Sequence, residues 1–498
     1  MPVGIAMEEE AAVAGFGLTE THISILIFTP DRVYKIKKPV VFGFVDLSSV
    51  AARVNACVDE VALNSRLAPD VYEGVGRFAG PDGAVEPVVV MRRLPAESRL
   101  TNIIVGDGAA AHRAIRDIAS RLADFHEHAA RRGPDVAAAC TAEAVESLWR
   151  TNLSELQTVT AGLIDTKWMH RASELADKYL GGRRAAFAER IRRDRSVEGH
   201  GDLLCDDIFC LPDGPRLLDC LEFDPVLRCV DTLHDACSLA CDLEAHGRAD
   251  LAELFLEEYR HASGDAWPPS LQHFYMAYRA AVRAKVECLG AGAPADRAGR
   301  ASQRLGQALD HLAQGQIRTV LVGGLPGTGK STMARSLHDA TGWPVISSDV
   351  VRKRLVGLEP GDDATAPFGE GLYSTNHTAL TYAALLNEAE ALMRSGYSVI
   401  IDASWTTDQW RRAARRMASD CAATLSELRC VAPTRIAHGR IRSRSAHALH
   451  TSDATPEIAD EMASATEPWS QATYIDTTDD RATALREALT AIFESDAR

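Results

Sequence analysis

The run from Thr319 to Met333, TVLVGGLPGTGKSTM, restricts the fold of this chain more than any other stretch. An apolar, strand-like segment at 319–322 precedes its glycines, and a helix-compatible segment at 331–337 follows them. A strand, a glycine-rich loop and a helix in this order predict an α/β domain with a parallel sheet. The residues at the fixed positions of the pattern G-x-x-x-x-G-K-[ST] are Gly324, Gly329, Lys330 and Ser331.

The same loop predicts a site for the phosphates of ATP. Glycines let backbone N–H groups turn toward phosphate oxygens, and the N-terminus of the following helix adds partial positive charge. We expect Lys330 to reach the β- and γ-phosphates and the Ser331 hydroxyl to bind Mg²⁺. The alternative is a glycine-rich turn without a ligand. The predicted ATP-binding residues are Gly324, Leu325, Pro326, Gly327, Thr328, Gly329, Lys330, Ser331 and Thr332.

The length and charge of the chain limit its organisation and its partners. A chain of 498 residues is too long for one hydrophobic core and predicts two or three domains. Residues 316–498 contain 19 basic and 23 acidic side chains and so carry −4, while the first 315 residues carry −11 of the total −15. Neither part has the basic excess expected for tight, nonspecific binding to nucleic acid.

Cysteine usage and hydropathy indicate the compartment. The 11 cysteines form no C-x-x-C pair and no Cys/His spacing typical of a metal site, which indicates buried thiols in a reducing environment. The segment MPVGIAMEEE has no basic n-region and no apolar h-region, and no stretch approaches about 18 uninterrupted apolar residues. We therefore expect a cytoplasmic protein without a membrane partner.

The first hundred residues combine strands with one helix. Residues 22–45 predict two or three β-strands with a turn at Pro30-Asp31, residues 51–67 a helix that carries Glu60, and residues 85–94 a further strand. This order resembles the small lobe of a kinase.

A further signal lies at 200–219, HGDLLCDDIFCLPDGPRLLD. His200, Gly201 and Asp202 match the H-G-D start of the catalytic loop in aminoglycoside phosphotransferase-like kinases, and Asp219 falls where that family has its metal-binding Asp. The alternatives are a chance triplet and an Asp that ends a strand. Other matching segments are THIS (21–24), VYKIKKPV (33–40), DEVALNSRLAP (59–69) and VVMRRLP (89–95). The chain thus resembles a bacterial family in which an aminoglycoside phosphotransferase-like domain is fused to a P-loop kinase.

The resemblance implies a role for each matched residue. Asp202 would accept or orient the proton of the attacking hydroxyl, and Asp219 would hold Mg²⁺ against the phosphates. Lys35, paired with Glu60, would position the phosphates, and VVMRRLP would form the hinge beside the adenine. Lys37 competes with Lys35 for this role because both lysines alternate onto one face of a strand.

Two departures from the family pattern concern activity. Such kinases place a metal-binding Asn five residues after the catalytic Asp, where this chain has Asp207. A carboxylate can bind Mg²⁺, but its extra charge repels triphosphate unless the metal is present. In addition, no G-x-G-x-x-G precedes Lys35.

Several other polar residues of the first domain favour structural interpretations. Asp224, Asp231 and Asp235 lie in a stretch, 224–248, whose apolar residues recur at helical intervals and predict a helix under the catalytic loop. Such acids cap helices or support loop backbone. Residues 109–130 predict a helix with His126 and His128 on its surface. Its apolar face consists of Ile115, Ile118, Leu122 and Phe125.

Small residues and a proline at 290–294 predict a domain boundary. We expect a kinase-like domain at 1–290, with a small lobe at about 1–95 and a large lobe at about 96–290. A linker and helix at 291–315 would lead into a P-loop domain at 316–498. The predicted fold class is a two-lobed α+β kinase-like domain followed by an α/β P-loop domain with a parallel sheet.

Residues after the P-loop favour a kinase over a motor or a GTPase. Asp349 and Arg352 form a D-x-x-R spacing similar to that of polynucleotide kinases, zeta toxins and chloramphenicol phosphotransferases. Asp349 could take a proton from an acceptor hydroxyl, and Arg352 could hold the acceptor. Asp402 ends an apolar strand and is suited to binding Mg²⁺. The alternatives are helix-capping or turn-capping acids and a surface arginine.

Two arginine clusters follow. The segment 433–444, PTRIAHGRIRSR, resembles the lid of a small P-loop kinase, in which an arginine closes over the phosphates. Arg440 and Arg444 lie one helical turn apart, and we predict Arg444 as the catalytic one, with a solvated helix face as the alternative. For Arg411, Arg412, Arg415 and Arg416 we favour a solvated basic face.

These observations favour a tandem ATP-dependent phosphotransferase that acts on a small hydroxylated acceptor such as an aminoglycoside, a sugar or a nucleotide. One alternative is a nucleotide-binding pseudokinase domain that regulates an active P-loop half. Another is an ATP-binding sensor without an acceptor.

Overall fold

The computed structural model describes residues 16–493 except 22, 43–44, 81–82, 84, 107, 130–133, 161–163, 290–293, 360–361, 363–370, 445–454 and 479. The chain divides into two compact units. The first unit comprises the residues up to Ala176, Phe187–Trp267 and Leu271–Gly315. The second unit comprises Asp177–Ala186, Pro268–Ser270 and the residues from Gln316 onward. Most of the predicted boundary at 290–294 lies outside the described residues.

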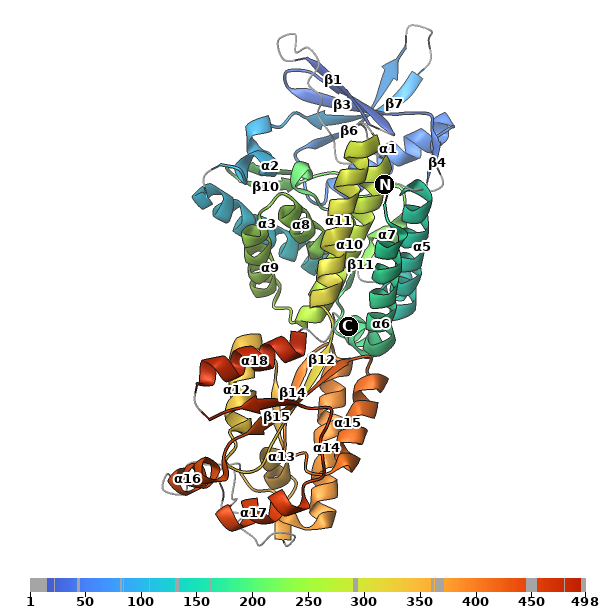
Figure 1. The fold of residues 1–498 in the computed structure, drawn as a ribbon. Coiled ribbons are helices and arrows are strands. Elements are labelled where there is room, and N and C mark those ends of the chain that lie inside the picture. The colour runs from blue at the N-terminus through green and yellow to red at the C-terminus, as the bar shows by residue number, and fades with distance from the viewer. Residues whose placement is uncertain are drawn as a thin grey trace. The chain divides into compact units, whose positions relative to one another are not determined.

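The small lobe of the first unit is a five-stranded antiparallel sheet with one helix, α1 (Val50–Asn64), packed on it (Figure 1). Ser49 caps this helix by accepting a hydrogen bond from the Ala52 N–H. In β3, alternate residues Val33, Lys35 and Lys37 are buried, because successive side chains of a strand point to opposite faces. The strands in sheet order are β1 (Gly17–Glu20), β2 (Ser24–Phe28), β3 (Arg32–Lys37), β7 (Val85–Arg92) and β6 (Tyr72–Ala79), and a separate pair is formed by β4 (Val41–Phe42) and β5 (Val45–Asp46).

The large lobe of the first unit is mainly helical. Its two short two-stranded antiparallel sheets are β8 (Ser196–Glu198) with β11 (Cys229–Asp231) and the hairpin β9 (Ile208–Leu211) with β10 (Gly214–Leu217). The predicted apolar face of α3 is buried as expected. The helices are α2 (Leu100–Ile103), α3 (Gly108–His128), α4 (Pro134–Ala139), α5 (Ala142–Thr160), α6 (Thr166–Arg192), α7 (Pro225–Arg228), α8 (Thr232–Ala245), α9 (Ala249–Ser263), α10 (Pro269–Leu289) and α11 (Pro294–Gln314).

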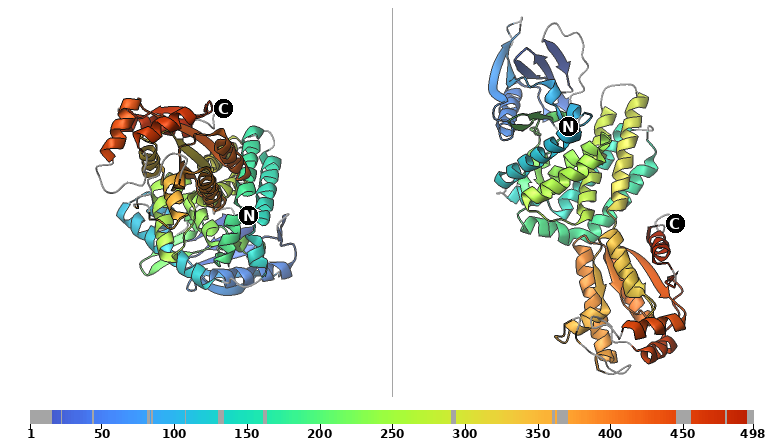
Figure 2. Two further views of the ribbon diagram at one scale, coloured as in Figure 1. Left: turned by 90° about the horizontal axis from the view of Figure 1, so that it is seen from below. Right: turned by 90° about the vertical axis from the view of Figure 1, so that its left-hand side faces the viewer.

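The second unit is built on a five-stranded sheet in which all pairs are parallel, as predicted (Figure 1 and Figure 2). The strand that leads into the glycine loop, β12, is central and entirely buried, as expected for parallel strands covered on both faces. The strands in sheet order are β13 (Val345–Ser347), β14 (Val399–Asp402), β12 (Arg318–Gly323), β15 (Thr424–Val431) and β16 (Thr473–Asp476). The helices are α12 (Lys330–Thr341), α13 (Ser348–Arg354), α14 (Thr375–Arg394), α15 (Asp408–Asp420), α16 (Thr434–Arg444), α17 (Pro456–Ala465) and α18 (Arg481–Phe493).

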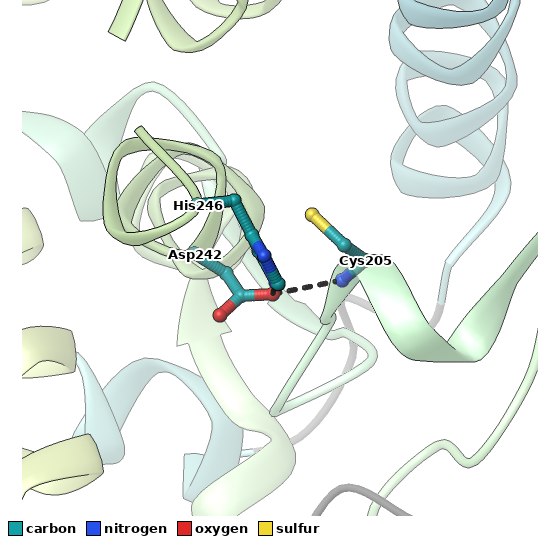
Figure 3. Close-up of side chains that lie close together, drawn as sticks. All are labelled: Cys205, Asp242 and His246. Atoms are coloured by element: carbon teal, nitrogen blue, oxygen red, sulfur yellow. Dashed lines mark hydrogen bonds and ion pairs between the residues drawn. The ribbon is translucent and has the colours of Figure 1, made fainter. Parts of the chain in front are cut away.

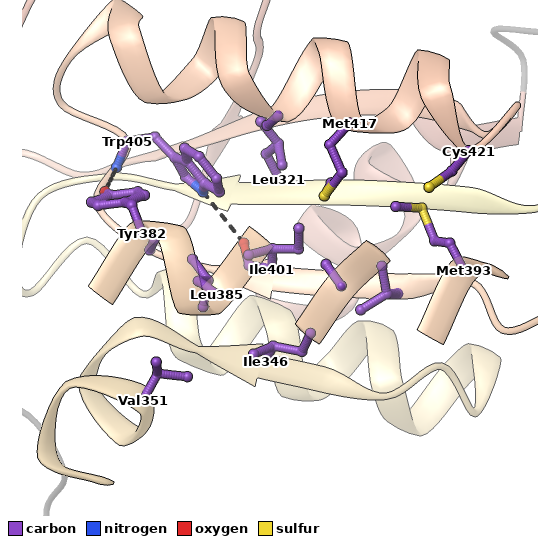
Figure 4. Packing of buried hydrophobic residues seen from close by; sticks show 14 of the residues in the cluster. Leu321, Ile346, Val351, Tyr382, Leu385, Met393, Ile401, Trp405, Met417 and Cys421 are labelled. Atoms are coloured by element: carbon purple, nitrogen blue, oxygen red, sulfur yellow. Dashed lines mark hydrogen bonds between the residues drawn. The ribbon is translucent and has the colours of Figure 1, made fainter. Parts of the chain in front are cut away.

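Two hydrophobic cores hold this sheet. One lies between the strands and α12 and α18, and includes Val320, Met333 and Ile492. The other lies on α14 and α15, where Figure 4 shows Tyr382 and Trp405 at one end of the packed row. The Trp405 backbone N–H donates to the Tyr382 hydroxyl at 3.1 Å, so this core fixes the chain just after β14.

The 11 cysteines all lie in described parts of the chain, and each is buried or half-buried and without a disulfide. Burial raises the pKa of every one of these thiols above its ordinary value. A search of the described residues for helices with the length and apolar character of a membrane span returns none.

Candidate active sites

The glycine loop joins β12 to α12 in a conformation that depends on glycine. Gly324 has φ +141°, and a Cβ there would lie 2.6 Å from the Cys430 carbonyl oxygen. Gly327 has φ +81°, and a Cβ there would collide with the Ala437 carbonyl. Both positions therefore need a residue without a side chain. The Thr328 hydroxyl donates to the Leu325 carbonyl at 2.8 Å and closes the turn.

A cavity of about 620 Å³ opens beside this loop and the start of α12. Lys330, Ser331 and Thr332 line it, together with Arg440 and Thr477. The volume is in the range of small-molecule pockets. The predicted phosphate-binding loop therefore borders a space for a ligand.

Asp402, at the end of β14, lies next to the first turn of α12. The Ser331 hydroxyl hydrogen-bonds to its carboxylate, which is 4% exposed. Burial raises the pKa of Asp402, nearby Asp349 raises it further, and Lys330 and Ser331 oppose the rise. Among the described residues, Asp402 Oδ1 has no hydrogen-bond partner. A buried carboxylate oxygen beside a serine hydroxyl fits the donor set that Mg²⁺ prefers.

Asp349 and Arg352 lie on α13, but their surroundings differ. Asp349 is half-buried and close enough to Asp402 to influence its pKa. Arg352 is buried, donates to the Leu372 carbonyl at 2.8 Å and lies over the Tyr373 ring at 4.7 Å. Arg352 is thus already held by the segment that precedes α14.

Arg440, in the helix α16 of the predicted lid, contacts Thr477 and the glycine loop. Its guanidinium donates to the Thr477 hydroxyl at 3.2 Å and to the Thr477 carbonyl at 2.6 Å. A longer contact of 3.4 Å reaches the Gly327 carbonyl in the glycine loop. The side chain of Arg444 lies outside the described part of the chain, so its catalytic role stays a prediction.

In the first unit, two lysines and three acids form one buried network. Lys35 Nζ lies 2.8 Å from Glu60 and 2.8 Å from Asp219. Lys37 Nζ lies 2.6 Å from the other Glu60 oxygen and 2.5 Å from Glu222. Burial opposes the charge on Lys35, but the neighbouring carboxylates outweigh it and raise its pKa. Both lysines therefore contact Glu60, and Lys35 is the one in contact with Asp219.

The predicted catalytic loop places several acids close together. Burial raises the pKa of Asp207 well above its usual range, and Asp219, Asp206 and Asp202 add to the rise. Asp202 itself is 5% exposed and lies 3.7 Å from Arg283 Nη1. Acids that repel one another in this way fit a site for a divalent cation, which relieves the repulsion when bound.

The backbone of this loop is held by Asp235 of α8, as the interpretation of that residue anticipated. Its carboxylate accepts hydrogen bonds from the backbone N–H groups of His200 at 2.7 Å and Gly201 at 2.9 Å. His126 Nε2 lies 3.0 Å from the same carboxylate. A Cβ at Gly199 would collide with Asp235, so the loop also needs glycine there.

The prediction that His126 lies on the surface is wrong. His126 is 2% exposed and contacts Asp235 and the Tyr259 hydroxyl, the latter at 2.7 Å. His128 is exposed, as expected. His126 follows Ile115, Ile118 and Leu122 at helical spacing, so the apolar face of α3 already contained its signal.

A solvated face is also wrong for Arg411. Its side chain is completely buried and donates to the backbone carbonyls of Trp405 at 3.2 Å and Pro468 at 2.8 Å. Arg412 is exposed and pairs with Asp408, in keeping with the surface interpretation. Arg411 therefore ties the segment after β14 to the segment after α17.

Asp242 and Cys205 support the predicted catalytic loop from a second point. Figure 3 shows the side chains of Cys205, Asp242 and His246, whose potential ligand atoms lie within 4.8 Å of one another. Asp242 is already engaged: it accepts from the Cys205 backbone N–H at 3.0 Å and from Arg304 at 3.1 Å. Burial raises the pKa of the Cys205 thiol well above its ordinary value, which disfavours the thiolate that binds metals. We interpret this group as a structural anchor.

Comparisons with known proteins cover nearly the whole chain. "Uncharacterized protein Rv2004c" of Mycobacterium tuberculosis and "Uncharacterized protein Mb2027c" of Mycobacterium bovis are each 40% identical over 474 residues, which is 94% of this chain and 94% of each relative. The chain belongs to their family. A family model described as "AAA domain" matches residues 320–469 of this family member.

Solved structures resemble this family member over one part or the other. The GDP and kanamycin complex of APH(2")-IIia is 15% identical, covers 61% of this chain and 94% of its own, and has a TM-score of 0.37. A gluconokinase from Sinorhizobium meliloti 1021 is 19% identical, covers 35% of this chain and 91% of its own, and has a TM-score of 0.26. The predicted fold class, a two-lobed kinase-like domain followed by an α/β P-loop domain, is confirmed.

Asp402→Asn in this family member is expected to stabilise the metal-free second unit at pH 8 by on the order of 1 kcal/mol. The folded state raises the Asp402 pKa, so the proton-linked stability is present at low pH and is lost as pH rises through the folded pKa. Asn carries no charge and avoids that loss. Thermal melting at pH 8 and pH 4 checks this, with the surface change Asp420→Asn as the control. Equal effects of the two variants at pH 8 would contradict it.

Proposed function

We propose that the chain is an ATP-dependent tandem phosphotransferase, in which each unit moves the γ-phosphoryl group of ATP to a small hydroxylated acceptor. The observation that carries the proposal is the position of Lys35 Nζ, 2.8 Å from both Glu60 and Asp219. A lysine held between a helix carboxylate and a candidate metal-binding carboxylate is the arrangement that kinases use to position phosphates. The second phosphate site, at Lys330, supports the tandem form of the proposal.

In the first unit, the proposed roles follow from position and charge. Asp202 takes the proton of the acceptor hydroxyl, and Lys35 positions the phosphates. Asp219 and Asp207 would hold Mg²⁺, which supplies positive charge against the phosphates. Asp235 orients Asp202 indirectly, by fixing the backbone of the loop that carries it.

In the second unit, backbone N–H groups of the loop 324–332 and Lys330 hold the phosphates. Ser331 and Asp402 would hold Mg²⁺, with Asp402 Oδ1 as the buried oxygen in need of a partner. Asp349 takes the acceptor proton, and Arg352 positions the acceptor from its place over Tyr373. Arg444 neutralises charge on the moving phosphoryl group.

The proposed acceptors are aminoglycosides, sugars or nucleotides, and the proposed compartment is the cytoplasm. The experiment is transfer of label from γ-labelled ATP, with Mg²⁺, to a panel of these compounds, using the unmodified chain, Lys330→Ala and Asp202→Ala. We expect each variant to lose transfer to a different acceptor. Label appearing only as free phosphate in all three proteins would overturn the proposal.

A second candidate, a pseudokinase first unit that regulates the P-loop half, is favoured by one observation. Asp207 stands where kinases have an Asn, and burial beside three other acids raises its pKa. A carboxyl group that retains its proton is a poorer metal ligand than a carboxylate.

Asp207→Asn distinguishes the two candidates. If the first unit is an active kinase, the variant is expected to increase its transfer rate severalfold, because an amide oxygen binds Mg²⁺ without the added repulsion. The measurement is initial transfer rate at pH 7, with the neighbouring, more exposed Asp206→Asn as the control. An unchanged, undetectable rate would support the pseudokinase.

A further inference from the structure

A second cavity, in the first unit, lies beside Asp202 and apart from the Lys35 network. Its volume is about 430 Å³, and α5, α10 and the loop residues Gly201 and Asp202 form much of its wall. This volume suits a small molecule. A compound in this cavity would lie next to the carboxylate proposed to take a proton.

Part of the wall is apolar and aromatic. Leu148 and Val282 contribute aliphatic surface, and the rings of His234 and Tyr275 stack at 4.7 Å. Burial lowers the pKa of His234 well below its usual value, so this ring is neutral at physiological pH. This part of the wall therefore suits the carbon skeleton of a ligand and attracts neither a cation nor an anion strongly.

The acids that line the cavity mostly have partners already. Asp231 is held by Arg190, Glu155 lies 2.5 Å from Lys285, and Asp202 faces Arg283. The fourth acid, half-buried Asp224, accepts the Val226 N–H as the cap of α7. A pocket for a polycation such as an aminoglycoside needs several uncompensated carboxylates, and this cavity offers at most one.

Arg279 of α10 is the buried charge that lacks such a partner. It is 7% exposed, and its Nη1 donates to the Gly201 carbonyl at 2.5 Å. Its Nε and Nη2 have no hydrogen-bond partner in the described part of the chain, and no described carboxylate lies within ion-pair distance. Asp235 attracts it at longer range but gives its own oxygens to His126, His200 and Gly201. A buried guanidinium without hydrogen-bond acceptors is costly.

The unsatisfied atoms of Arg279 form the edge of a guanidinium that binds oxyanions. Nε and Nη2 together hold both oxygens of a carboxylate elsewhere in this chain, for example in the pairs of Arg53 with Glu86, Arg190 with Asp231 and Arg415 with Glu427. Such bidentate pairs are strong and geometrically specific. Asn152 of α5 lines the same cavity, is 2% exposed and has neither side-chain amide atom paired within the described structure.

We propose that this cavity binds the acceptor of the first unit and that the acceptor is a small hydroxylated anion, with its carboxylate or phosphate group on Arg279. The inference rests on the proposed phosphotransferase function. The acceptor hydroxyl oxygen bonds to the γ-phosphorus, the bond from that phosphorus to the bridging oxygen breaks, ADP leaves, and the proton passes to Asp202. Arg279 Nε and Nη2 are covered by the cavity wall, so an entering anion displaces a side chain to reach them.

The test compares probes that share a six-carbon hydroxylated skeleton and differ in charge. Gluconate, glucose 6-phosphate, glucose and glucosamine are titrated into the full chain with a nonhydrolysable ATP analogue present, which occupies the nucleotide sites. Calorimetry gives affinity, and hydrogen exchange of α10 gives the place of binding. The variants are Arg279→Gln, Arg279→Lys, which keeps the charge but not the fork, and the surface control Arg116→Gln.

Gluconate or glucose 6-phosphate is expected to bind and to protect α10, and Arg279→Gln to weaken this binding at least about tenfold. The two anions separate a carboxylate from a phosphate as the recognised group. Arg279→Lys folds with its charge retained and is expected to lose most of the same affinity, because lysine cannot bind both oxygens.

Failure of this inference differs from failure of the proposed function. Phosphate transfer to glucose or glucosamine that Arg279→Gln leaves unchanged overturns the anionic class but keeps the phosphotransferase. Anion binding at Arg279 without transfer of label keeps the site but removes the kinase activity of the first unit. Equal binding of all four probes, or binding of neither anion, overturns the inference.

Discussion

Asp235→Ala is expected to destabilise the first unit by about 3–5 kcal/mol, because it removes a buried carboxylate and leaves its donors unpaired. Those donors are the His200 and Gly201 backbone N–H groups, at 2.7 and 2.9 Å, and His126 Nε2, at 3.0 Å. Burial alone would raise the pKa of Asp235, but the hydrogen bond and charge of His126 outweigh it and hold the pKa below its usual range. The native loop therefore depends on the charged form.

Hydrogen exchange of the segment 199–203 measures this effect directly. The His200 and Gly201 amides should exchange much faster in Asp235→Ala, while amides of β12 in the second unit should keep their rates. Asp235→Asn retains one acceptor oxygen and should fall between the two proteins. Asp250→Ala, which breaks an exposed pair with Arg248, is the matched control and should cost less than about 1 kcal/mol. Unchanged loop exchange in Asp235→Ala would refute this account of the loop.

Arg190→Leu is expected to destabilise the first unit by a similar amount, about 3–5 kcal/mol. The Arg190 guanidinium lies 2.6 Å from Asp231 and 2.7 Å from Asp265, and all three side chains are at most 4% exposed. Its removal leaves buried Asp231 without a counter-charge and leaves Asp265 with only Arg195, whose Nε lies 3.3 Å away. Leucine fills part of the space but cannot replace five N–H donors.

Arg193, three residues after Arg190, supplies a matched control. Arg193 makes an exposed pair with Glu189, so Arg193→Leu should change stability by no more than about 0.5 kcal/mol. The measurement is the urea midpoint of the unfolding transition that includes the first unit. A cost for Arg190→Leu below about 1 kcal/mol would show that the two acids find other partners or protons.

Local sequence was sufficient to predict those elements whose characteristic residues are adjacent in the chain. The P-loop and the strand before it are adjacent in the chain, so spacing alone predicted β12, the loop and α12. The choice between Lys35 and Lys37 could not be made in this way, because the two-residue period of a strand gives both the same face. The structure adds the contact of Lys35 with Asp219, 184 residues away, while the roles of both lysines stay predictions.

The contacts that local sequence could not specify join residues that lie far apart in the chain. Asp235 follows the loop it holds by 34 residues, and Arg279 follows Gly201 by 78. No pattern within a window of one helix or strand contains such a pair. Arg411 is different, because Arg411, Ala414, Ala418 and Cys421 recur at helical spacing and are all buried. The charge of Arg411 suggested a solvated side chain, whereas its position in this helical pattern predicts burial.

The cysteines make the folded chain slow to react with thiol reagents, since the reactive species is the thiolate and each thiol is buried or half-buried and harder to ionise. Nine of them lie in the first unit, and Cys421 and Cys430 lie in the second. Mass spectrometry can tell the alkylated peptides apart. The rate of alkylation at Cys220 therefore reports how often the first unit unfolds locally, and the rate at Cys430 reports the same for the second unit. No added label is needed.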